Sequence, residues 1–327
     1  MDVICIGEAL IDFFAVQPGL GLRDVTEFRR IAGGAPANVA VGVAKLGKKS
    51  AFIGCVGNDE FGFYLRDVLV ENQVNVELLQ FDNSARTGLA FISLPTPTTR
   101  EFLFYRNPSA DMHIDSKKFD IKFIQKAKIF HFGSITLISE PSCSSTLKAV
   151  EIARKAGSII SYDPNLRISL WSDSSAAKEQ IRKAVPLADI IKVNNEELEF
   201  LTGETDIKKG LKELLKGGAK LGIVTIGAEG SFFSAEDFNG FVPVYDVKTV
   251  DTTGCGDSFV AAMLSRIADR DLNKVLDSKE EIISIVEMAT AAASLTSMKK
   301  GVIPALPRKN ELDNFIRELK NNKEIKG

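Results

Sequence analysis

The residues best placed to do chemistry form one block, from Asp251 to Asp257, with the sequence Asp-Thr-Thr-Gly-Cys-Gly-Asp. The apolar run from Ser258 to Leu264 predicts a helix after this block, and the segment from Phe241 to Val250 predicts a strand before it. The block therefore begins a helix, where unpaired backbone N–H groups and the positive end of the helix dipole bind anions, above all phosphate. Its glycines would let the backbone approach a phosphate closely.

Asp257 falls in the first turn of that predicted helix. A carboxylate at this place lies beside any bound phosphoryl group and can take a proton from an attacking hydroxyl. Aspartate is also favoured as a helix cap, so a purely structural role is the alternative. We predict that Asp257 is a general base and that Gly254, Cys255 and Gly256 stabilise a phosphoryl group through their backbone N–H groups.

A second group of polar residues lies near the N-terminus. Asp12 follows a buried strand expected at 3–6, and Gly33, Gly34 and Asn38 lie at the start of a predicted helix. The glycines would let a sugar lie against the backbone, and the Asn38 amide can both donate and accept hydrogen bonds. A turn aspartate and a simple glycine turn are the alternatives.

Polar residues also follow three predicted strands farther along the chain. They form the segments 163–167, 194–197 and 225–230, with the sequences Asp-Pro-Asn-Leu-Arg, Asn-Asn-Glu-Glu and Thr-Ile-Gly-Ala-Glu-Gly. Open α/β sheets bind ligands at the carboxyl ends of their strands, so these segments and the 251–257 block would form one site. It would combine an anion cradle, the cation Arg167 with Lys192 as a second candidate, and carboxylates able to hold hydrated Mg²⁺, which are the parts that phosphoryl transfer requires. A tight turn at 163–165 and dipole-stabilising glutamates at 196–197 are the alternatives.

The elements that must position these residues follow an alternating pattern. Buried strands are predicted at 3–6, 51–56, 129–132, 159–162, 190–193 and 222–226, and helices at 36–46, 61–69, 143–157, 175–185, 207–216 and 279–298. This alternation predicts an α/β fold with a mainly parallel sheet that helices cover on both faces.

Two strands at 89–94 and 101–105, joined by residues 95–99, interrupt the alternation as a predicted hairpin. A hairpin inserted into an α/β core is a candidate lid over a ligand, and an added edge hairpin is the alternative. The segments 231–234 and 241–244 predict an antiparallel extension of the main sheet.

Composition argues against several other classes of protein. The net charge is −2 and no basic run occurs, which disfavours nucleic acid or an anionic membrane as a partner. No apolar stretch reaches the roughly 18 residues of a membrane span, and the N-terminus lacks the pattern of a secretory signal. Four scattered cysteines favour a reducing cytoplasm, and the two histidines, His113 and His131, disfavour a histidine-based triad or metal site.

Two of these blocks resemble the signatures of the PfkB (ribokinase-like) sugar kinases. The segment from Gly33 to Gly47 resembles the first signature, and the 251–257 block resembles the second, with Cys255 where the family usually has alanine. Asn194-x-x-Glu197 matches a further motif of the family, and the segment 225–230 is similar to its nucleotide-side loop.

The resemblance implies a ribokinase-like three-layer αβα sandwich with a mainly parallel central sheet and a small β lid. The core would comprise 1–12, 33–86 and 109–327, and the lid would comprise 13–32 and 87–108. ATP would be the phosphoryl donor, held by Lys192, Asn194, Thr225, Gly227, Gly230, Gly254 and Gly256. Asn194 and Glu197 would bind Mg²⁺ through water, Asp251 and Thr253 would bind a monovalent cation such as K⁺, and pairing of lids would give a homodimer.

Within this family the chain looks most like the fructokinases, on the segments 104–111, 163–167 and 300–307. The acceptor would then be D-fructose and the product fructose 6-phosphate. The sugar would be bound by Asp12, Gly33, Gly34, Asn38, Arg106 and Asp257, with Arg167 among the catalytic groups. Arg106 is expected to reach over the sugar from the lid, and an exposed charge at a strand end is the alternative.

Three other functions remain open. A 2-keto-3-deoxygluconate kinase, or another PfkB sugar kinase, shares parts of these motifs. A catalytically silent sugar- or nucleotide-binding regulator could have the same fold, although a pure binder has no need of a base such as Asp257. A dehydrogenase is disfavoured, because the residues Gly7-Glu8-Ala9 after the first strand break the Gly-x-Gly-x-x-Gly pattern of dinucleotide-binding sheets.

Overall fold

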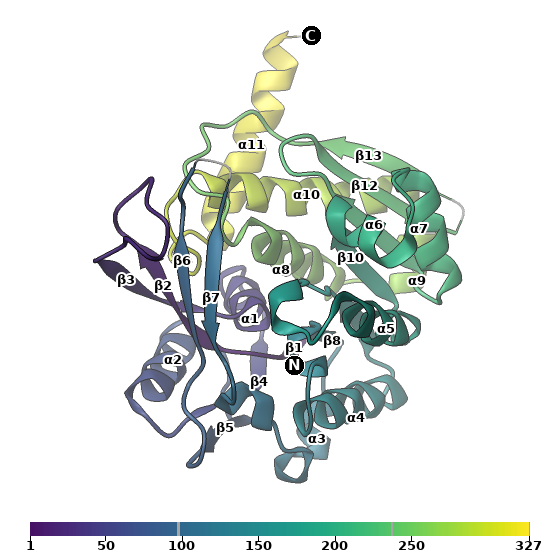
Figure 1. The fold of residues 1–327 in the computed structure, drawn as a ribbon. Helices are drawn as coiled ribbons and strands as arrows, with labels where there is room; N and C mark the ends of the chain where they lie inside the picture. Colours follow the sequence, from purple (N-terminus) through teal and green to yellow (C-terminus); the bar gives the residue numbers. More distant parts are fainter. Residues whose placement is uncertain (97–98, 237, 327) are drawn as a thin grey trace.

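A nine-stranded sheet forms the centre of the molecule (Figure 1). The computed structural model describes residues 1–96, 99–236 and 238–326. The strands lie in the order β13-β12-β11-β10-β9-β8-β1-β4-β5; those from β11 to β5 run parallel, and β12 and β13 add an antiparallel extension. Their bounds are β1 (Val3–Ile6), β4 (Ser50–Gly57), β5 (Leu79–Asp82), β8 (Ile129–Phe132), β9 (Ile159–Tyr162), β10 (Ile190–Asn194), β11 (Leu221–Thr225), β12 (Gly230–Ala235) and β13 (Asn239–Pro243).

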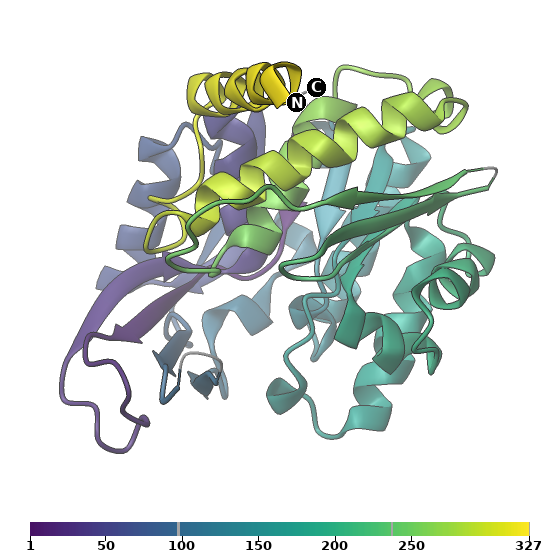
Figure 2. The same ribbon diagram turned by 90° about the horizontal axis from the view of Figure 1, so that it is seen from above.

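Helices cover both faces of this sheet, as Figure 2 shows from above. One face carries α1 (Ala35–Lys45), α2 (Glu60–Glu71), α8 (Cys255–Ile267), α9 (Leu272–Leu276), α10 (Lys279–Ser297) and α11 (Lys309–Lys326). The other carries α3 (Ile121–Ile124), α4 (Ser142–Lys155), α5 (Ser174–Ala184), α6 (Asn195–Thr202) and α7 (Ile207–Lys216). Short 3₁₀ helices lie at 110–113, 116–118, 135–137, 168–170 and 185–187. Within the described residues, none of these helices has both the length and the apolar character needed to cross a membrane.

Two hydrophobic cores lie on opposite faces of the sheet. In β1, Val3 and Cys5 belong to the core beneath α1 and α8, whereas Ile4 and Ile6 belong to the core beneath α4. Successive side chains of a strand point to opposite faces, so a strand that is apolar at every position must be covered on both sides. The three-layer α/β fold predicted from the sequence is confirmed.

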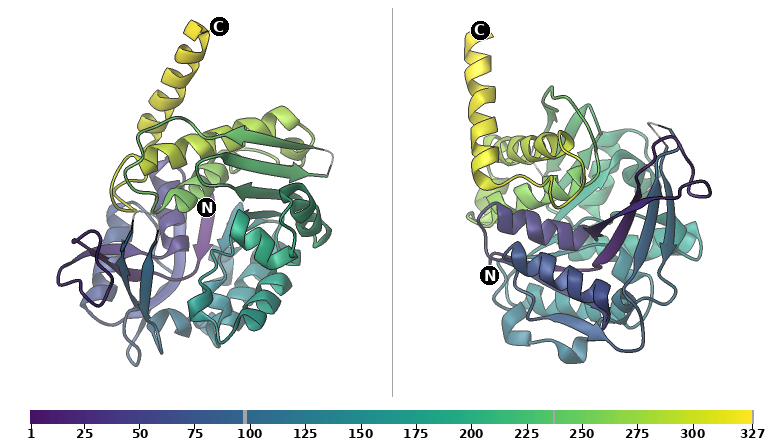
Figure 3. Two further views of the ribbon diagram at one scale, coloured as in Figure 1. Left: turned by 45° about the horizontal axis from the view of Figure 1, so that its top comes forward. Right: turned by 90° about the vertical axis from the view of Figure 1, so that its left-hand side faces the viewer.

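A smaller four-stranded sheet stands beside the main body, as the two views of Figure 3 show. It consists, in the order β3-β2-β6-β7, of β3 (Phe28–Gly33), β2 (Leu10–Ala15), β6 (Leu89–Ser93) and β7 (Glu101–Tyr105), and we call it the lid sheet. β2 pairs antiparallel with β3 and parallel with β6, which joins the N-terminal segment to the predicted hairpin of β6 and β7. Part of the predicted hairpin connection, residues 97–98, lies outside the described residues.

The predicted strand from Phe241 to Val250 is wrong beyond Pro243, where β13 ends and a loop begins. The backbone N–H groups of Val250 and Asp251 donate to the carbonyl of Ser297, at 2.7 and 3.0 Å. The loop therefore bonds to the end of α10 rather than to a neighbouring strand. This contact holds the start of the 251–257 block against α10, and the block then continues into α8, which begins at Cys255.

Candidate active site

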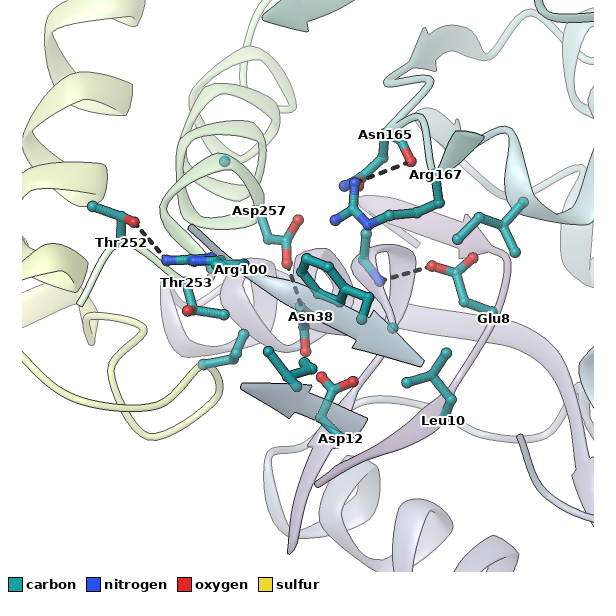
Figure 4. Close-up of a pocket in the computed structure, with 18 of the residues that line it drawn as sticks. Glu8, Leu10, Asp12, Asn38, Arg100, Asn165, Arg167, Thr252, Thr253 and Asp257 are labelled. Carbon is teal, nitrogen blue, oxygen red and sulfur yellow. Dashed lines mark hydrogen bonds between the residues drawn. The ribbon is translucent and has the colours of Figure 1, made fainter. Parts of the chain in front are cut away.

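A cavity of about 250 Å³ lies between the lid sheet, the N-terminus of α8 and the carboxyl ends of the main-sheet strands (Figure 4). Many of the residues singled out in the sequence line it, namely Asp12, Gly34, Asn38, Arg167, Lys192, Asn194, Glu197, Thr253, Gly254, Gly256 and Asp257. Gly33 lies just behind this wall, where any side chain would overlap the carboxylate of Asp12. The cavity therefore gathers residues from the two halves of the chain into one site.

The 251–257 block turns into α8 at Gly254, the N-cap residue, which has a φ of 81°. A Cβ atom there would lie 2.8 Å from Cγ1 of Val302, so both the backbone conformation and the space require glycine. The N–H groups of Gly254 and Gly256 have no acceptor within the described residues, whereas that of Cys255 donates to the carbonyl of Thr252 at 3.3 Å. The anion cradle thus rests on Gly254 and Gly256 more than on Cys255.

Asp257 lies in the first turn of α8, and its carboxyl is buried in the cavity wall. The Nδ2 atom of Asn38 donates to Asp257 Oδ2 at 2.8 Å, and Asp257 Oδ1 makes no hydrogen bond within the described part of the chain. Burial raises the pKa of Asp257 to about 6, although the Asn38 hydrogen bond opposes this rise. Such a carboxyl is ionised at neutral pH and basic enough to accept a proton.

Asn38 reaches the cavity from α1, which opens at Gly34 with a φ of 106°. A side chain at Gly34 would overlap the carbonyl oxygen of Glu8, so this glycine permits the close approach. The Oδ1 atom of Asn38 is buried and has no hydrogen-bond donor within the described residues. Because buried acceptors in native proteins are almost always paired, this oxygen indicates a ligand with a hydroxyl or amine donor.

Two further carboxyls line the cavity. Burial raises the pKa of Asp12 to about 7, against the attraction of Arg167. Burial likewise raises the pKa of Glu8 to about 7, although Glu8 accepts the N–H of Ala35 at 2.9 Å. The sequence reasoning missed Glu8 as a site residue. Its available signal was a carboxylate directly after the first strand.

Lys192 extends from β10 towards the start of α8. Its Nζ atom bonds the buried carboxylate of Asp163 at 3.0 Å and lies 3.4 Å from the place that a Cβ atom of Gly256 would take. Desolvation lowers the pKa of Lys192, but the charges of Asp163 and Glu197 outweigh it, so the pKa lies above its ordinary value. A permanently charged ammonium therefore lies beside the anion cradle.

Two arginines face the cavity from opposite walls. Arg167 is half-buried and donates through Nη1 to the carbonyl of Leu166 at 3.0 Å. Arg100, which the sequence reasoning missed, lies just before β7 and donates through Nη2 to Thr252 Oγ1 at 2.8 Å. The only signal for Arg100 was a basic residue at the end of the hairpin connection.

Asn194 and Glu197 form a capping box at the start of α6. Asn194 Oδ1 accepts the N–H of Glu197 at 2.8 Å, and Glu197 Oε2 accepts the N–H of Asn194 at 2.9 Å. Glu197 Oε1 also accepts the N–H of Leu166 at 2.7 Å. Burial and the nearby Asp163 raise the pKa of Glu197. Of the two adjacent glutamates, Glu197 faces the cavity and Glu196 is exposed.

Arg106 does not line the cavity, which differs from the prediction that it reaches over the sugar. It is buried at the end of β7, and its Nε atom donates to Asp111 Oδ2 at 2.9 Å, with a second contact from Nη2 to the same oxygen. The guanidinium is therefore committed to a buried ion pair. It is also not the exposed strand-end charge that the alternative expected.

Three other predicted residues lie between the end of β11 and the start of β12, inclusive. Thr225 ends β11, while Gly227 and Gly230 have φ angles of 49° and 141°, and a side chain at Gly230 would overlap the carbonyl of Val242. Backbone geometry alone accounts for both glycines, and none of the three residues lines the cavity. Their role with a nucleotide stays a prediction.

Asp251 ties the block to the loop after α10. Its Oδ1 atom accepts the N–H and the hydroxyl of Thr253 at 2.9 and 2.7 Å, and its Oδ2 atom accepts the N–H of Gly301 at 3.2 Å. These bonds hold the approach to α8 in place. Cation binding by Asp251 and Thr253 stays a prediction.

Comparison with known proteins gives consistent matches over nearly the whole chain. The family model for the pfkB family of carbohydrate kinases matches residues 1–309. The chain is 48% identical to a probable fructokinase-6, chloroplastic, of Arabidopsis thaliana, over 96% of this chain and 82% of that protein. It is 45% identical to fructokinase-2 of Solanum lycopersicum, over 94% of each chain.

Solved structures agree with these sequence matches. A fructokinase with bound ATP from Xylella fastidiosa superposes with a TM-score of 0.90 at 33% identity, over 98% of this chain and 99% of that chain. A fructokinase from Vibrio cholerae O395 with bound fructose, ADP and calcium ion superposes with a TM-score of 0.85 at 34% identity, over 96% of this chain and 98% of that chain.

Proposed function

Because the chain belongs to the pfkB family of carbohydrate kinases, we propose that it is an ATP-dependent fructokinase that converts D-fructose to fructose 6-phosphate. The fructokinases it resembles support the choice of sugar. One observation carries the mechanism: Asp257, at the start of α8, shares a 2.8 Å hydrogen bond with Asn38 in a cavity beneath the lid sheet. This arrangement places three groups around one cavity: the Asp257 carboxylate as base, Asn38 Oδ1 as hydrogen-bond acceptor, and the anion cradle at the start of α8.

In the proposed reaction Asp257 accepts the proton of the sugar 6-hydroxyl. The hydroxyl oxygen forms a bond to the γ-phosphorus of ATP, the bond from that phosphorus to the β,γ-bridging oxygen breaks, and ADP leaves with the electron pair. The N–H groups of Gly254 and Gly256 and the Lys192 ammonium are positioned to stabilise the charge that develops on the transferred group. Arg167 adds positive charge from the facing wall.

We propose that the sugar is held between Asn38 and the lid sheet, whose strand β2 carries Asp12. The unpaired Asn38 Oδ1 would accept from one sugar hydroxyl, and the backbone at Gly33 and Gly34 would allow the ring to approach closely. A site built to satisfy hydroxyls rejects analogues that leave its buried polar atoms unpaired. Arg106 would support this region through Asp111 without touching the sugar.

The residues Asn194 and Glu197 fit a water-mediated Mg²⁺ site. Both oxygens of the Glu197 carboxylate accept backbone N–H groups and retain lone pairs for water molecules. When bound, Mg²⁺ neutralises charge on the ATP phosphates. Thr225, Gly227 and Gly230 are proposed to border the nucleotide, and Asp251 and Thr253 to hold K⁺, on the strength of the family resemblance.

We further propose that residues 1–12, 33–86 and 109–327 act as the kinase core and that 13–32 and 87–108 move as a lid. Pairing of two lids would give a homodimer, which the exposure of Leu103 and Tyr105 on β7 supports.

The cytoplasm is the proposed compartment, supported by four cysteines that are all unpaired. A tagged copy in fractionated cells would test this, since a chloroplast is the compartment in the name of one similar protein.

The test of the proposed function is a sugar panel with MgATP. We expect kcat/KM for fructose to exceed that for ribose, glucose and 2-keto-3-deoxygluconate by more than about tenfold, a barrier difference of roughly 1.4 kcal/mol. A larger value for the keto acid or for ribose would refute the fructokinase assignment and leave a kinase of another sugar. ADP release with none of the sugars would instead favour the silent regulator.

A further inference from the structure

Arg100 joins the lid sheet to the 251–257 block. It follows the β6–β7 connection, and its Nη2 atom donates to Thr252 Oγ1 at 2.8 Å and lies 3.8 Å from Asp251 Oδ1. Figure 4 shows its guanidinium directed towards Thr252. The start of β7 is fixed by Glu101, whose carboxylate accepts the N–H of Leu22 at 2.7 Å. The position of Arg100 is therefore tied to the position of the lid sheet.

The charge of Arg100 is less compensated than that of Lys192. The Lys192 ammonium is buried against Asp163 at 3.0 Å, whereas Arg100 stands 3.8 Å from Asp251 without a hydrogen bond to it. The Arg100 side chain is 32% exposed and lines the same cavity as Gly254, Gly256 and Asp257. A guanidinium has five N–H donors, so Arg100 keeps donors beyond the one that Thr252 takes. The cavity that Arg100 lines also contains the anion cradle, so a phosphoryl group bound there could use these donors.

We propose that Arg100 is a catalytic residue, supplied by the lid sheet, that binds the γ-phosphoryl group of the nucleotide when the lid covers the sugar. This inference rests on the proposed kinase function and deepens it. Arginine suits the task because its planar fork donates two hydrogen bonds to phosphate oxygens. The bond changes are those given above: Arg100 forms and breaks no covalent bond and moves no proton. It stabilises the charge on the transferred group and makes nucleotide binding depend on the closed lid.

The first test is the turnover of Arg100→Gln. We expect kcat with fructose and MgATP to fall by about tenfold or more, as for loss of one donor to a developing negative charge. Arg100→Lys should recover part of this loss, because it restores the charge but not the fork. Arg29→Gln is the matched control, since Arg29 is an exposed arginine of the same sheet, on β3, and does not line the cavity. A kcat for Arg100→Gln within twofold of wild type would overturn the proposal.

The second test separates a contact with the γ-phosphoryl group from a structural role. With fructose present, Arg100→Gln should weaken binding of the β,γ-imido analogue of ATP by about tenfold while the affinity for ADP changes less than about twofold, because ADP lacks the phosphoryl group that Arg100 contacts. Calorimetric titration measures both. Equal losses for the two nucleotides would mean that Arg100 shapes the site without touching that group.

Thr252→Val completes the comparison, because it removes the hydroxyl that Arg100 contacts and keeps the arginine. We expect its kcat to stay within about threefold of wild type, since in the proposal the rate depends on the Arg100 N–H groups that bind the phosphoryl group and not on the one that binds Thr252. A loss as large as that of Arg100→Gln would show that Arg100 acts only through Thr252, and would overturn the phosphoryl contact.

The sugar panel keeps this test separate from the proposed function. If the wild-type protein prefers another sugar, the fructokinase assignment fails and the Arg100 variants are measured with that sugar. If the wild-type protein transfers phosphate to no sugar, both proposals fail.

Discussion

Asn38 and Asp257 are separated by 219 positions in the chain, yet they share one hydrogen bond in the cavity. That bond favours the ionised form of Asp257, while burial favours the neutral form, and the balance leaves a pKa of about 6. Glu8 and Asp12 line the same cavity and have pKa values of about 7. In the proposed mechanism, the ionisation of these residues therefore links sugar binding, catalysis and stability.

The first residue-scale prediction concerns pH. Asp257 must be ionised to accept a proton, so kcat/KM should fall as the pH drops through the range from about 7 to 6, the range of the three carboxyl pKa values. Asn38→Leu removes a hydrogen bond that lowers the pKa of Asp257, so the acid limb should move to higher pH. The pH profile of kcat/KM measures this shift, because its midpoint reports the ionisation of the free enzyme, whereas weaker sugar binding lowers the plateau. If the acid limb of the Asn38→Leu profile stayed at the wild-type pH, Asn38 would have no influence on the ionisation of Asp257.

The second residue-scale prediction concerns stability. Folding raises the pKa of Asp12 from 3.8 to about 7. The contribution of the Asp12 ionisation to the free energy of unfolding is therefore fully present below pH 3.8 and is lost as the pH rises through 7. At pH 8 Asp12→Asn should therefore raise Tm by about 2 °C or more, and the gain should shrink at pH 5. Thermal melting without sugar at both values measures it, with the exposed Asp24→Asn as control. A lower Tm for Asp12→Asn at pH 8 would contradict the assignment of burial as the dominant effect.

At the scale of elements, the start of α8 matters most. Gly254 needs its left-handed conformation to turn the loop into the helix, and α10 holds that loop through the carbonyl of Ser297. The helix start then presents the N–H groups of Gly254 and Gly256 to the cavity. In the proposed mechanism, the backbone of this element, rather than its side chains, forms the anion cradle.

The element-scale prediction compares two neighbouring substitutions. Cys255→Ala should keep kcat within about threefold of wild type, because the role of the cradle uses only backbone groups. Burial also raises the pKa of the Cys255 thiol to about 12, so this thiol stays protonated at neutral pH. Gly254→Ala should lose activity more than about tenfold, since a left-handed alanine costs roughly 1–2 kcal/mol and distorts the cradle. A folded but inactive Cys255→Ala would require a role for the thiol.

At the scale of the whole molecule, the exposed face of the lid sheet leads to a prediction about assembly. Leu103 and Tyr105 of β7 are 48% and 61% exposed, which is unusual for large apolar side chains on a short edge strand. Burial of this face between two copies would give a homodimer, and Tyr105→Glu should then favour the monomer. Light scattering at micromolar concentration measures the mass. A monomeric wild-type protein would contradict the dimer and leave the cavity unaffected.

Much of this architecture could be predicted from periodicity, because the buried parallel strand β1 is apolar at every position and β8 is apolar at every position except His131. The path of residues 244–254 could not be predicted. The residues up to Val250 have the pattern of a strand, but the N–H groups of Val250 and Asp251 bond to the carbonyl of Ser297 at the end of α10 instead of to a neighbouring strand. Arg106 illustrates a second limit: a sequence does not reveal that Asp111 will bury it in an ion pair. The contact of Arg100 with Thr252 depends on the packing of the lid sheet, which local sequence does not encode.

The most direct test of the central claim is the turnover of Asp257→Asn with fructose and MgATP. The variant keeps the shape of the side chain and an oxygen that can accept from Asn38, so it should fold and bind the β,γ-imido analogue of ATP as the wild type does. Its kcat should fall by roughly 10²-fold or more, because the amide that replaces the carboxylate cannot accept the proton of the 6-hydroxyl. A kcat close to that of the wild type would remove Asp257 from the mechanism and contradict the account.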